Sequence, residues 1–165
     1  MLKKLKEKLS KKENNIIQIG CPIEGEVVSI KEVNDPTFSQ EMLGKGIAIK
    51  PNKGRVVAPV DGEIAMIFET KHAVSMLTEQ GAEILIHIGL DTVKLKGENF
   101  NSHVKAGDKV KAGDLLIEFD KEKISQAGYD TITPMVICNS FEYAQVNQTT
   151  LGDIQELTSV IEIIK

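Results

Sequence analysis

Short apolar runs, separated by clusters of glycine, proline and asparagine, fill most of the chain after residue 15. In Ala73–Leu77 and Ile84–Leu90 apolar and polar positions alternate, which is typical of half-buried β-strands. We predict strands at Ile16–Ile19, Glu26–Ile30, Gly46–Ile49, Arg55–Val57, Glu63–Phe68, Ala73–Leu77, Ile84–Leu90, Lys109–Val110, Leu115–Phe119, Thr133–Cys138 and Val160–Ile164. Their spacing predicts an all-β protein, built as an antiparallel β-sandwich or barrel.

Helical spacing is confined to a few stretches. We expect short helices at Pro36–Met42, where Asp35 is placed to cap the first turn, and at Glu122–Ala127. The order small, proline, apolar, acid, glycine, acid, apolar occurs twice, at Cys21–Val27 and at Ala58–Ile64. Such units form strand–turn–strand corners in barrel-sandwich folds, including biotinyl and lipoyl carrier domains, so they indicate architecture before function.

Residues 1–15 differ in composition from the rest of the chain. Leu2, Leu5 and Leu9 fall at helical spacing between lysines. One interpretation is a basic amphipathic helix that makes weak contact with an anionic membrane, and the other is a frayed tail, which so short a segment favours. We therefore divide the chain into a basic tail, 1–15, and one domain, 16–165.

Composition and charge exclude several classes of protein. The chain has 165 residues, 41% of them hydrophobic and 27% charged, with a net charge of −4. A net negative charge argues against nucleic acid as a partner, because a phosphate backbone demands a basic surface. Cys21 and Cys138 lie outside any CxxC spacing, and no apolar run approaches the length of a membrane span. These features lead us to expect a cytoplasmic protein with reduced thiols.

Two histidines, His72 and His87, lie in neighbouring predicted strands with the turn sequence Thr78–Gly81 between them. If a four-residue loop closes with Leu77 opposite Ala82, antiparallel register places His72 opposite His87. Directly opposed side chains project from the same sheet face with Cβ atoms about 5 Å apart. The pattern therefore predicts two imidazoles in contact, whereas a register shifted by one residue would separate them.

Several interpretations of this pair stay open. In one, neighbouring groups in the sheet simply satisfy each ring. A zinc enzyme would need a third ligand, and His103, the remaining histidine, lies in a separate segment without HExxH spacing. A non-catalytic barrel-sandwich carrier would need Lys71 at an exposed turn, but the expected pairing puts it on a strand. A regulatory binding module of the same architecture is the related alternative.

Phosphoryl transfer is the interpretation that uses both rings. A neutral imidazole nitrogen is a good nucleophile towards phosphorus, and a second imidazole can donate hydrogen bonds to the phosphoryl oxygens. This chemistry asks the protein mainly for positioning and electrostatic stabilisation. Since the sequence has no P-loop glycine motif, we expect the donor to be a phosphoprotein or a small phosphate compound.

At these residues the chain resembles the glucose-type IIA component of the bacterial phosphoenolpyruvate-dependent sugar phosphotransferase system. The similarity is carried by Gly81–Val93, Ala58–Gly62, Phe68–Ala73, Leu95–Glu98 and Val110–Asp114. It runs from about Ile16 to the C-terminal strand. It implies an all-β sandwich with Greek-key connections and a phosphotransferase activity carried by a phosphohistidine.

The resemblance also implies a role for each site residue. His87 would accept the phosphoryl group on Nε2 from the carrier protein HPr and pass it to a cysteine of the IIB domain of a sugar permease. His72 would stabilise the phosphoryl oxygens, and Thr70 would orient His72. The Gly89 carbonyl would accept from His87 Nδ1–H, and the absence of a side chain there would keep the approach clear for a partner.

A docking surface for these partners follows from the same resemblance. Asp35 and Asp91 would pair with arginines of HPr. An apolar rim would be formed by Phe38, Met42, Leu43, Phe68, Leu85 and Val93. We expect a monomer that requires no cofactor, although a zinc ion bridging His72, His87 and a partner's carboxylate would be consistent with the family.

Overall fold

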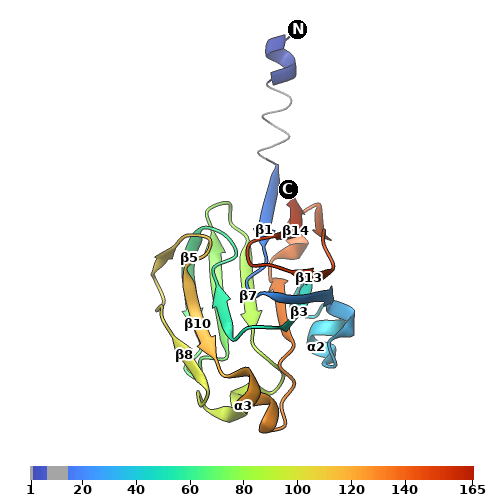
Figure 1. Ribbon diagram of the computed structural model, residues 1–165. Helices are drawn as coiled ribbons and strands as arrows, with labels where there is room; N and C mark the ends of the chain where they lie inside the picture. The colour runs from blue at the N-terminus through green and yellow to red at the C-terminus, as the bar shows by residue number, and fades with distance from the viewer. Residues whose placement is uncertain (1, 7–14) are drawn as a thin grey trace.

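Three antiparallel sheets contain the strands of the described residues, which are 2–6 and 15–165 of this computed structural model (Figure 1). The largest has the strand order β13-β2-β3-β11-β7-β6-β5-β9, and the smaller sheets have the orders β1-β14-β12 and β4-β10-β8. Every paired strand is antiparallel to its neighbour. The predicted antiparallel β-sandwich is confirmed.

The strands are short, and tight turns or brief helices connect them. They are β1 (Ile16–Gly20), β2 (Gly25–Ser29), β3 (Lys45–Pro51), β4 (Arg55–Val57), β5 (Gly62–Ile67), β6 (Ala73–Thr78), β7 (Glu83–His87), β8 (Phe100–Ser102), β9 (Lys109–Val110), β10 (Leu115–Phe119), β11 (Thr133–Ile137), β12 (Gln145–Gln148), β13 (Gly152–Ile154) and β14 (Ser159–Ile164). Within residues 15–165 the helices are α2 (Pro36–Ser39) and α3 (Lys121–Gln126), with 3-10 helices η1 (Ile30–Glu32), η2 (Thr92–Leu95) and η3 (Ser140–Glu142).

Buried aliphatic side chains hold the sheets together. Alternation along β7 sends Ile84 and Ile86 into the main core, while Leu85 packs against a smaller apolar cluster on the opposite face of the sheet. Phe38 of α2 belongs to this second cluster. Burying an aliphatic or phenylalanine side chain contributes about 1.5–3 kcal/mol, so α2 is anchored to the sheet mainly by that ring.

Local capping explains why α2 begins where it does. The Asp35 side chain accepts a hydrogen bond from Thr37 N at 3.0 Å, and Pro36 occupies the first turn, where its missing N–H costs nothing. Figure 1 shows α2 beside β3, and α3 at the end of the molecule opposite the C-terminus. The capped turn places Phe38 on the face of the large sheet that carries His87.

All eleven predicted strands are present, but three further strands were not predicted: β8, β12 and β13. The prediction for Ile84–Leu90 was too long, because β7 ends at His87 and Gly89 adopts a left-handed φ of 74°. Both predicted helices form, the first shorter than expected.

The predicted register of the β6–β7 hairpin was wrong by one residue. Ala73, not His72, lies opposite His87, and Leu77 lies opposite Glu83. The loop is shorter than expected because the Thr78 and Ala82 main chains already pair, and the Thr78 hydroxyl accepts from Ala82 N at 2.9 Å. Lys71 therefore lies in the turn before β6 and not on a strand.

Residues 2–6 are helical, and the Leu2 and Leu5 side chains are 77% and 59% exposed. Leu9, the third residue of the predicted apolar stripe, lies outside the described residues. Within the part of the chain that the structure describes, no helix has the length and apolar character to cross a membrane. Contact of residues 1–15 with lipid stays a prediction.

Candidate active site

The His72 and His87 rings are in contact even though the two residues are not paired in the sheet. Their ring centroids are 4.9 Å apart and the ring planes meet at 81°. Continued alternation would have put His72 on the same face as Val74, inside the main core. However, β6 begins only at Ala73, and Lys71 has a left-handed φ of 59°. The ring of His72 therefore reaches His87 from a turn.

His87, the last residue of β7, is half-buried and has a fixed orientation. Its Nδ1 lies 2.7 Å from the Gly89 carbonyl oxygen, which can only accept. In the neutral ring the proton therefore sits on Nδ1, and Nε2 keeps its lone pair. This is the arrangement that a nitrogen nucleophile needs.

His72 is held from the opposite side of the pair. Its Nδ1 lies 2.7 Å from Thr70 Oγ1, and its ring packs edge-on against Phe68 with 5.3 Å between centroids. If the Thr70 hydroxyl donates to Nδ1, the His72 proton sits on Nε2 and can be donated to a negatively charged group. The two rings then offer one lone pair and one N–H.

Apolar surroundings keep both rings neutral. Burial lowers the pKa of His72 to about 4, and the neighbouring His87 adds to that effect. Burial also lowers the pKa of His87, and hydrogen bonding to Gly89 and the charges of Asp35 and Asp91 oppose the shift. The centroid of the Phe38 ring lies 5.2 Å from that of the His87 ring, so Phe38 is part of these apolar surroundings.

The low pKa of His72 predicts that acid destabilises the fold. In the unfolded chain histidine titrates near 6.5, so below that pH the unfolded state binds a proton that the folded site refuses. The free energy of unfolding should fall between pH 6.5 and about pH 4, by up to about 3 kcal/mol from His72. Urea titrations at pH 7 and pH 5 measure the loss. An equally steep pH dependence in His72→Ala would contradict the assignment.

The residues of the expected docking surface lie at different depths. Met42, Leu43 and Val93 are 69%, 41% and 50% exposed. Phe38, by contrast, is only 4% exposed. Val93 lies in the 3-10 helix η2, whose only buried residue is Thr92.

The remaining members of that surface lie between these extremes. Phe68 and Leu85 are half-buried and Gly89 is buried. Asp91 is exposed in a left-handed turn, and Asp35 is half-buried at the start of α2. The negative charges of Asp35 and Asp91 both raise the pKa of His87, against the lowering effect of burial.

The sequence did not point to Thr92 and Asp130, which both contact the segment after His87. Thr92 is fully buried, and its hydroxyl donates to the Ile88 carbonyl. The Asp130 carbonyl accepts from Leu90 N at 3.0 Å. A threonine directly after Asp91 is only a weak sequence signal for a side chain that supports the turn. Nothing in the local sequence could connect Asp130 with a turn 40 positions earlier.

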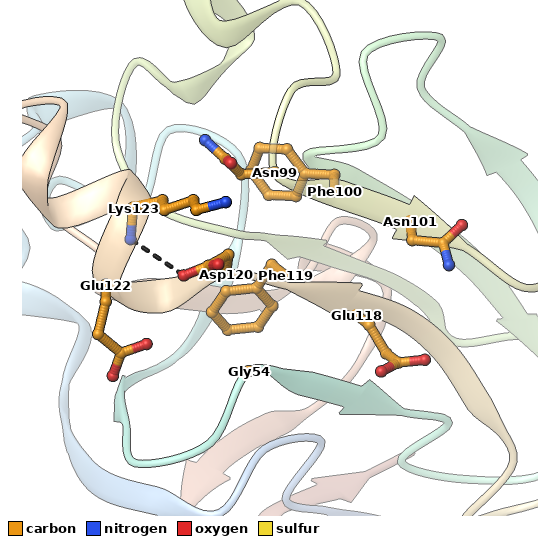
Figure 2. Close-up of a pocket in the computed structure, with 9 residues that line it drawn as sticks. All are labelled: Gly54, Asn99, Phe100, Asn101, Glu118, Phe119, Asp120, Glu122 and Lys123. Carbon is orange, nitrogen blue, oxygen red and sulfur yellow. Dashed lines mark hydrogen bonds between the residues drawn. The ribbon is translucent and has the colours of Figure 1, made fainter.

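A hollow opens on the small sheet β4-β10-β8, away from the histidine pair. Figure 2 shows its lining, which consists of Gly54, Asn99, Phe100, Asn101, Glu118, Phe119, Asp120, Glu122 and Lys123. Asp120 caps α3 by accepting from Lys123 N at 3.0 Å, and Glu118 lies 2.7 Å from His103 Nε2. Two of its acidic groups are thus engaged in local structure, and no histidine, cysteine, serine or threonine is among the residues that line it.

The fit of a zinc ion at the histidine pair is incomplete. Each ring has its Nδ1 engaged, so the pair could supply two Nε2 ligands. Among residues 2–6 and 15–165, no group of three or more His, Cys, Asp or Glu side chains is arranged to hold a metal. A bridging zinc would therefore need the rest of its ligands from a partner.

Comparisons with known proteins agree with this geometry. The model of the family described as "phosphoenolpyruvate-dependent sugar phosphotransferase system, EIIA 1" matches residues 17–143. The "PTS system glucose-specific EIIA component" of Oceanobacillus iheyensis is 46% identical over 147 residues, which cover 89% of each chain. The structure of "glucose permease IIA from Mycoplasma capricolum" superimposes with a TM-score of 0.84 at 32% identity, covering 91% of this chain and 97% of that one.

Some relatives are much longer than this chain. The "PTS system beta-glucoside-specific EIIBCA component" of Bacillus subtilis is 49% identical over 145 residues, which cover 88% of this chain but only 24% of that protein. The chain thus spans about a quarter of such multi-component relatives and most of the single-component ones. It belongs to the EIIA 1 family of the phosphoenolpyruvate-dependent sugar phosphotransferase system and is one of its phosphocarrier components.

Proposed function

We propose that the chain carries the phosphoryl group on His87 Nε2, receives it from phosphohistidine on HPr and passes it to a cysteine of a IIB domain. The observation that supports this most directly is the state of the two rings. Each has its Nδ1 engaged, at 2.7 Å from the Gly89 carbonyl or the Thr70 hydroxyl, so two adjacent Nε2 atoms are left for chemistry.

The proposed transfer needs no proton movement at His87. The Nε2 lone pair forms a bond to phosphorus as the bond between phosphorus and the donor imidazole breaks. The proton stays on Nδ1, which donates it to the Gly89 carbonyl throughout. His72 Nε2–H donates to a phosphoryl oxygen and stabilises the charge on the transferring group. In the second step a cysteine thiolate displaces His87 from phosphorus.

The proposal makes the chain a phosphotransferase component with two alternating protein partners. Its docking face is the apolar rim of Met42, Leu43 and Val93, with Asp35 and Asp91 as the acidic groups that meet arginines of HPr. One face must serve donor and acceptor in turn, so each interface should be modest and transient. We place the chain in the cytoplasm, as a monomer beside a membrane permease.

The names of the relatives support a IIB domain as the acceptor. The Bacillus subtilis relatives are named as EIIBCA and EIICBA components, specific for β-glucosides and for glucosamine. We propose that this chain serves a IIB domain in the same way. In this scheme the membrane-spanning component selects the sugar, not the IIA component.

Intact-mass measurement tests the proposed function. Incubation with phosphoenolpyruvate, enzyme I and HPr should add one phosphoryl group, and mild acid should remove it. The group should not appear when HPr is left out, and a panel of IIB domains should differ in how fast it discharges the phosphorylated chain. An acid-stable modification on Lys71 would instead indicate a carrier domain, and no modification would contradict the proposal.

A further inference from the structure

The Gly89 carbonyl that accepts from His87 belongs to a peptide unit that is held at both ends. Gly89 C=O and Leu90 N–H lie in one trans peptide plane and point in opposite directions. The carbonyl oxygen lies 2.7 Å from His87 Nδ1, and the N–H donates to the Asp130 carbonyl at 3.0 Å. The Asp130 main chain therefore fixes the direction in which the Gly89 carbonyl points.

The preceding residue, Ile88, is also held by two hydrogen bonds. Its N–H donates to the His72 carbonyl at 2.7 Å, and its carbonyl accepts from the Thr92 hydroxyl. Thr92 is completely buried and is one of the few polar side chains buried among the described residues. Because a buried carbonyl without a partner costs about 1–3 kcal/mol, the Thr92 hydroxyl stabilises this one conformation of the turn.

Thr92 also occupies the space beside Gly89. A Cβ built on Gly89 would lie 2.6 Å from Thr92 Cγ2 and 2.8 Å from the Asp130 carbonyl oxygen, and Gly89 has a φ of 74°. The turn is therefore packed against both residues. Its peptide planes cannot rotate without displacing the Thr92 methyl group or the Asp130 main chain.

The Asp130 side chain holds its own main chain in place. Its Oδ1 accepts from Ile132 N at 2.9 Å, which closes a tight turn directly before β11. Ile132 is buried with Leu90 in the smaller apolar cluster, to which Phe38 also belongs. The carboxylate thus fixes the carbonyl that receives Leu90 N–H, although it makes no contact with His87.

We propose that Thr92 and Asp130 are positioning residues that hold the Gly89 carbonyl against His87 Nδ1 and so keep His87 in the tautomer with a free Nε2. The expected change in the rate of phosphorylation rests on the proposed function, whereas the expected change in the His87 tautomer does not. Neither residue touches the phosphoryl group. Both act through the peptide between Gly89 and Leu90.

Thr92→Val tests the hydroxyl while nearly keeping the shape of the side chain. Imidazole nitrogen NMR shifts at neutral pH should show His87 as the pure Nδ1–H tautomer in the unmodified protein and as a mixture in Thr92→Val. Phosphorylation by HPr should slow about 10-fold, as expected for the loss of one buried hydrogen bond. Thr92→Ser restores the hydroxyl and should recover most of both properties.

Thr78→Val is the matched control. It also removes a hydroxyl–main-chain bond from a buried threonine, but at the other end of the β6–β7 hairpin. It should lower stability without changing the His87 tautomer. A pure Nδ1–H tautomer with unchanged phosphorylation in Thr92→Val would overturn the role of Thr92.

Asp130 gives an independent test that does not disturb the core, because its side chain is exposed. Asp130→Ala removes the acceptor for Ile132 N and should produce the same mixture of tautomers, whereas Asp130→Asn keeps an oxygen acceptor and should not. No change in Asp130→Ala would remove Asp130 from the proposal. If the unmodified chain holds the Nδ1–H tautomer yet is never phosphorylated, the proposed function fails while the positioning role stands.

Discussion

His87→Ala is expected to reduce phosphorylation by phospho-HPr to background, the largest effect that we predict for a single substitution. The change removes the nitrogen that bonds to phosphorus. In the His72 ring that remains, Nδ1 lies 2.7 Å from the Thr70 hydroxyl, which can donate to it and so leave the proton on Nε2. Removing the covalent nucleophile of a serine protease lowers the rate by on the order of 10⁶-fold, so no residual labelling should be measurable. The measurement is acid-labile phosphate per chain after incubation with phosphoenolpyruvate, enzyme I and HPr.

His103→Ala is the matched control for this substitution. His103 is the third histidine of the chain and pairs with Glu118, at 2.7 Å on the small sheet. Its loss should leave labelling unchanged. His87→Ala should still unfold cooperatively, because the alanine vacates only a half-buried position at the end of β7. Full labelling of a folded His87→Ala chain would end the assignment of His87.

The histidine pair could be predicted from alternation and a turn signal, but the path by which the rings meet could not. Strand alternation identifies which residues share a face of one strand. Which residues lie opposite each other on two strands depends on the register, which the loop sets. Here Thr78, not Leu77, lies opposite Ala82, and its hydroxyl accepts from Ala82 N, so the loop is one residue shorter than expected. The contact survives because His72 lies outside β6, where a left-handed Lys71 turns the chain. Such a turn at a non-glycine residue has no clear sequence signal.

The strands that escaped prediction are short or polar. β12 has the sequence QVNQ and β13 is GDI, so neither offers an alternation long enough to recognise. They form because neighbouring strands provide partners: β12 pairs with β14, and β13 pairs with β2. Tertiary pairing of this kind overrides local β-propensity.

The lowered pKa values and the hydrogen bonds at the site together fix the protonation of both rings. Burial against Phe38 and Phe68 disfavours the charged imidazolium, so both rings are neutral near pH 7. A neutral ring carries one N–H and one lone pair, and the partner of Nδ1 decides which nitrogen has which. Gly89 offers His87 only an acceptor, whereas Thr70 can donate to His72. The same side chain is thereby made a nucleophile at position 87 and a donor at position 72.

Because the two rings have different roles, His72→Ala should affect the two transfer steps differently. Acceptance from HPr should persist at a reduced rate, because His87 keeps its Nε2 lone pair and its bond to Gly89. Onward transfer to a IIB cysteine should slow by about 100- to 1,000-fold, the usual cost of removing one hydrogen-bond donor that stabilises a transition state. A chain phosphorylated in advance, mixed with a IIB domain in a single turnover, measures this step apart from loading.

Thr70→Val separates the presence of the His72 ring from its orientation. It keeps the imidazole but removes the hydroxyl that lies 2.7 Å from Nδ1, so the ring can exchange tautomers and offers its Nε2–H only part of the time. Transfer to IIB should then be slower than in the unmodified chain and faster than in His72→Ala. If His72→Ala discharges to IIB and supports sugar uptake at the normal rate, the second ring has no part in the transfer, and its contact with His87 only maintains the apolar environment that keeps His87 neutral.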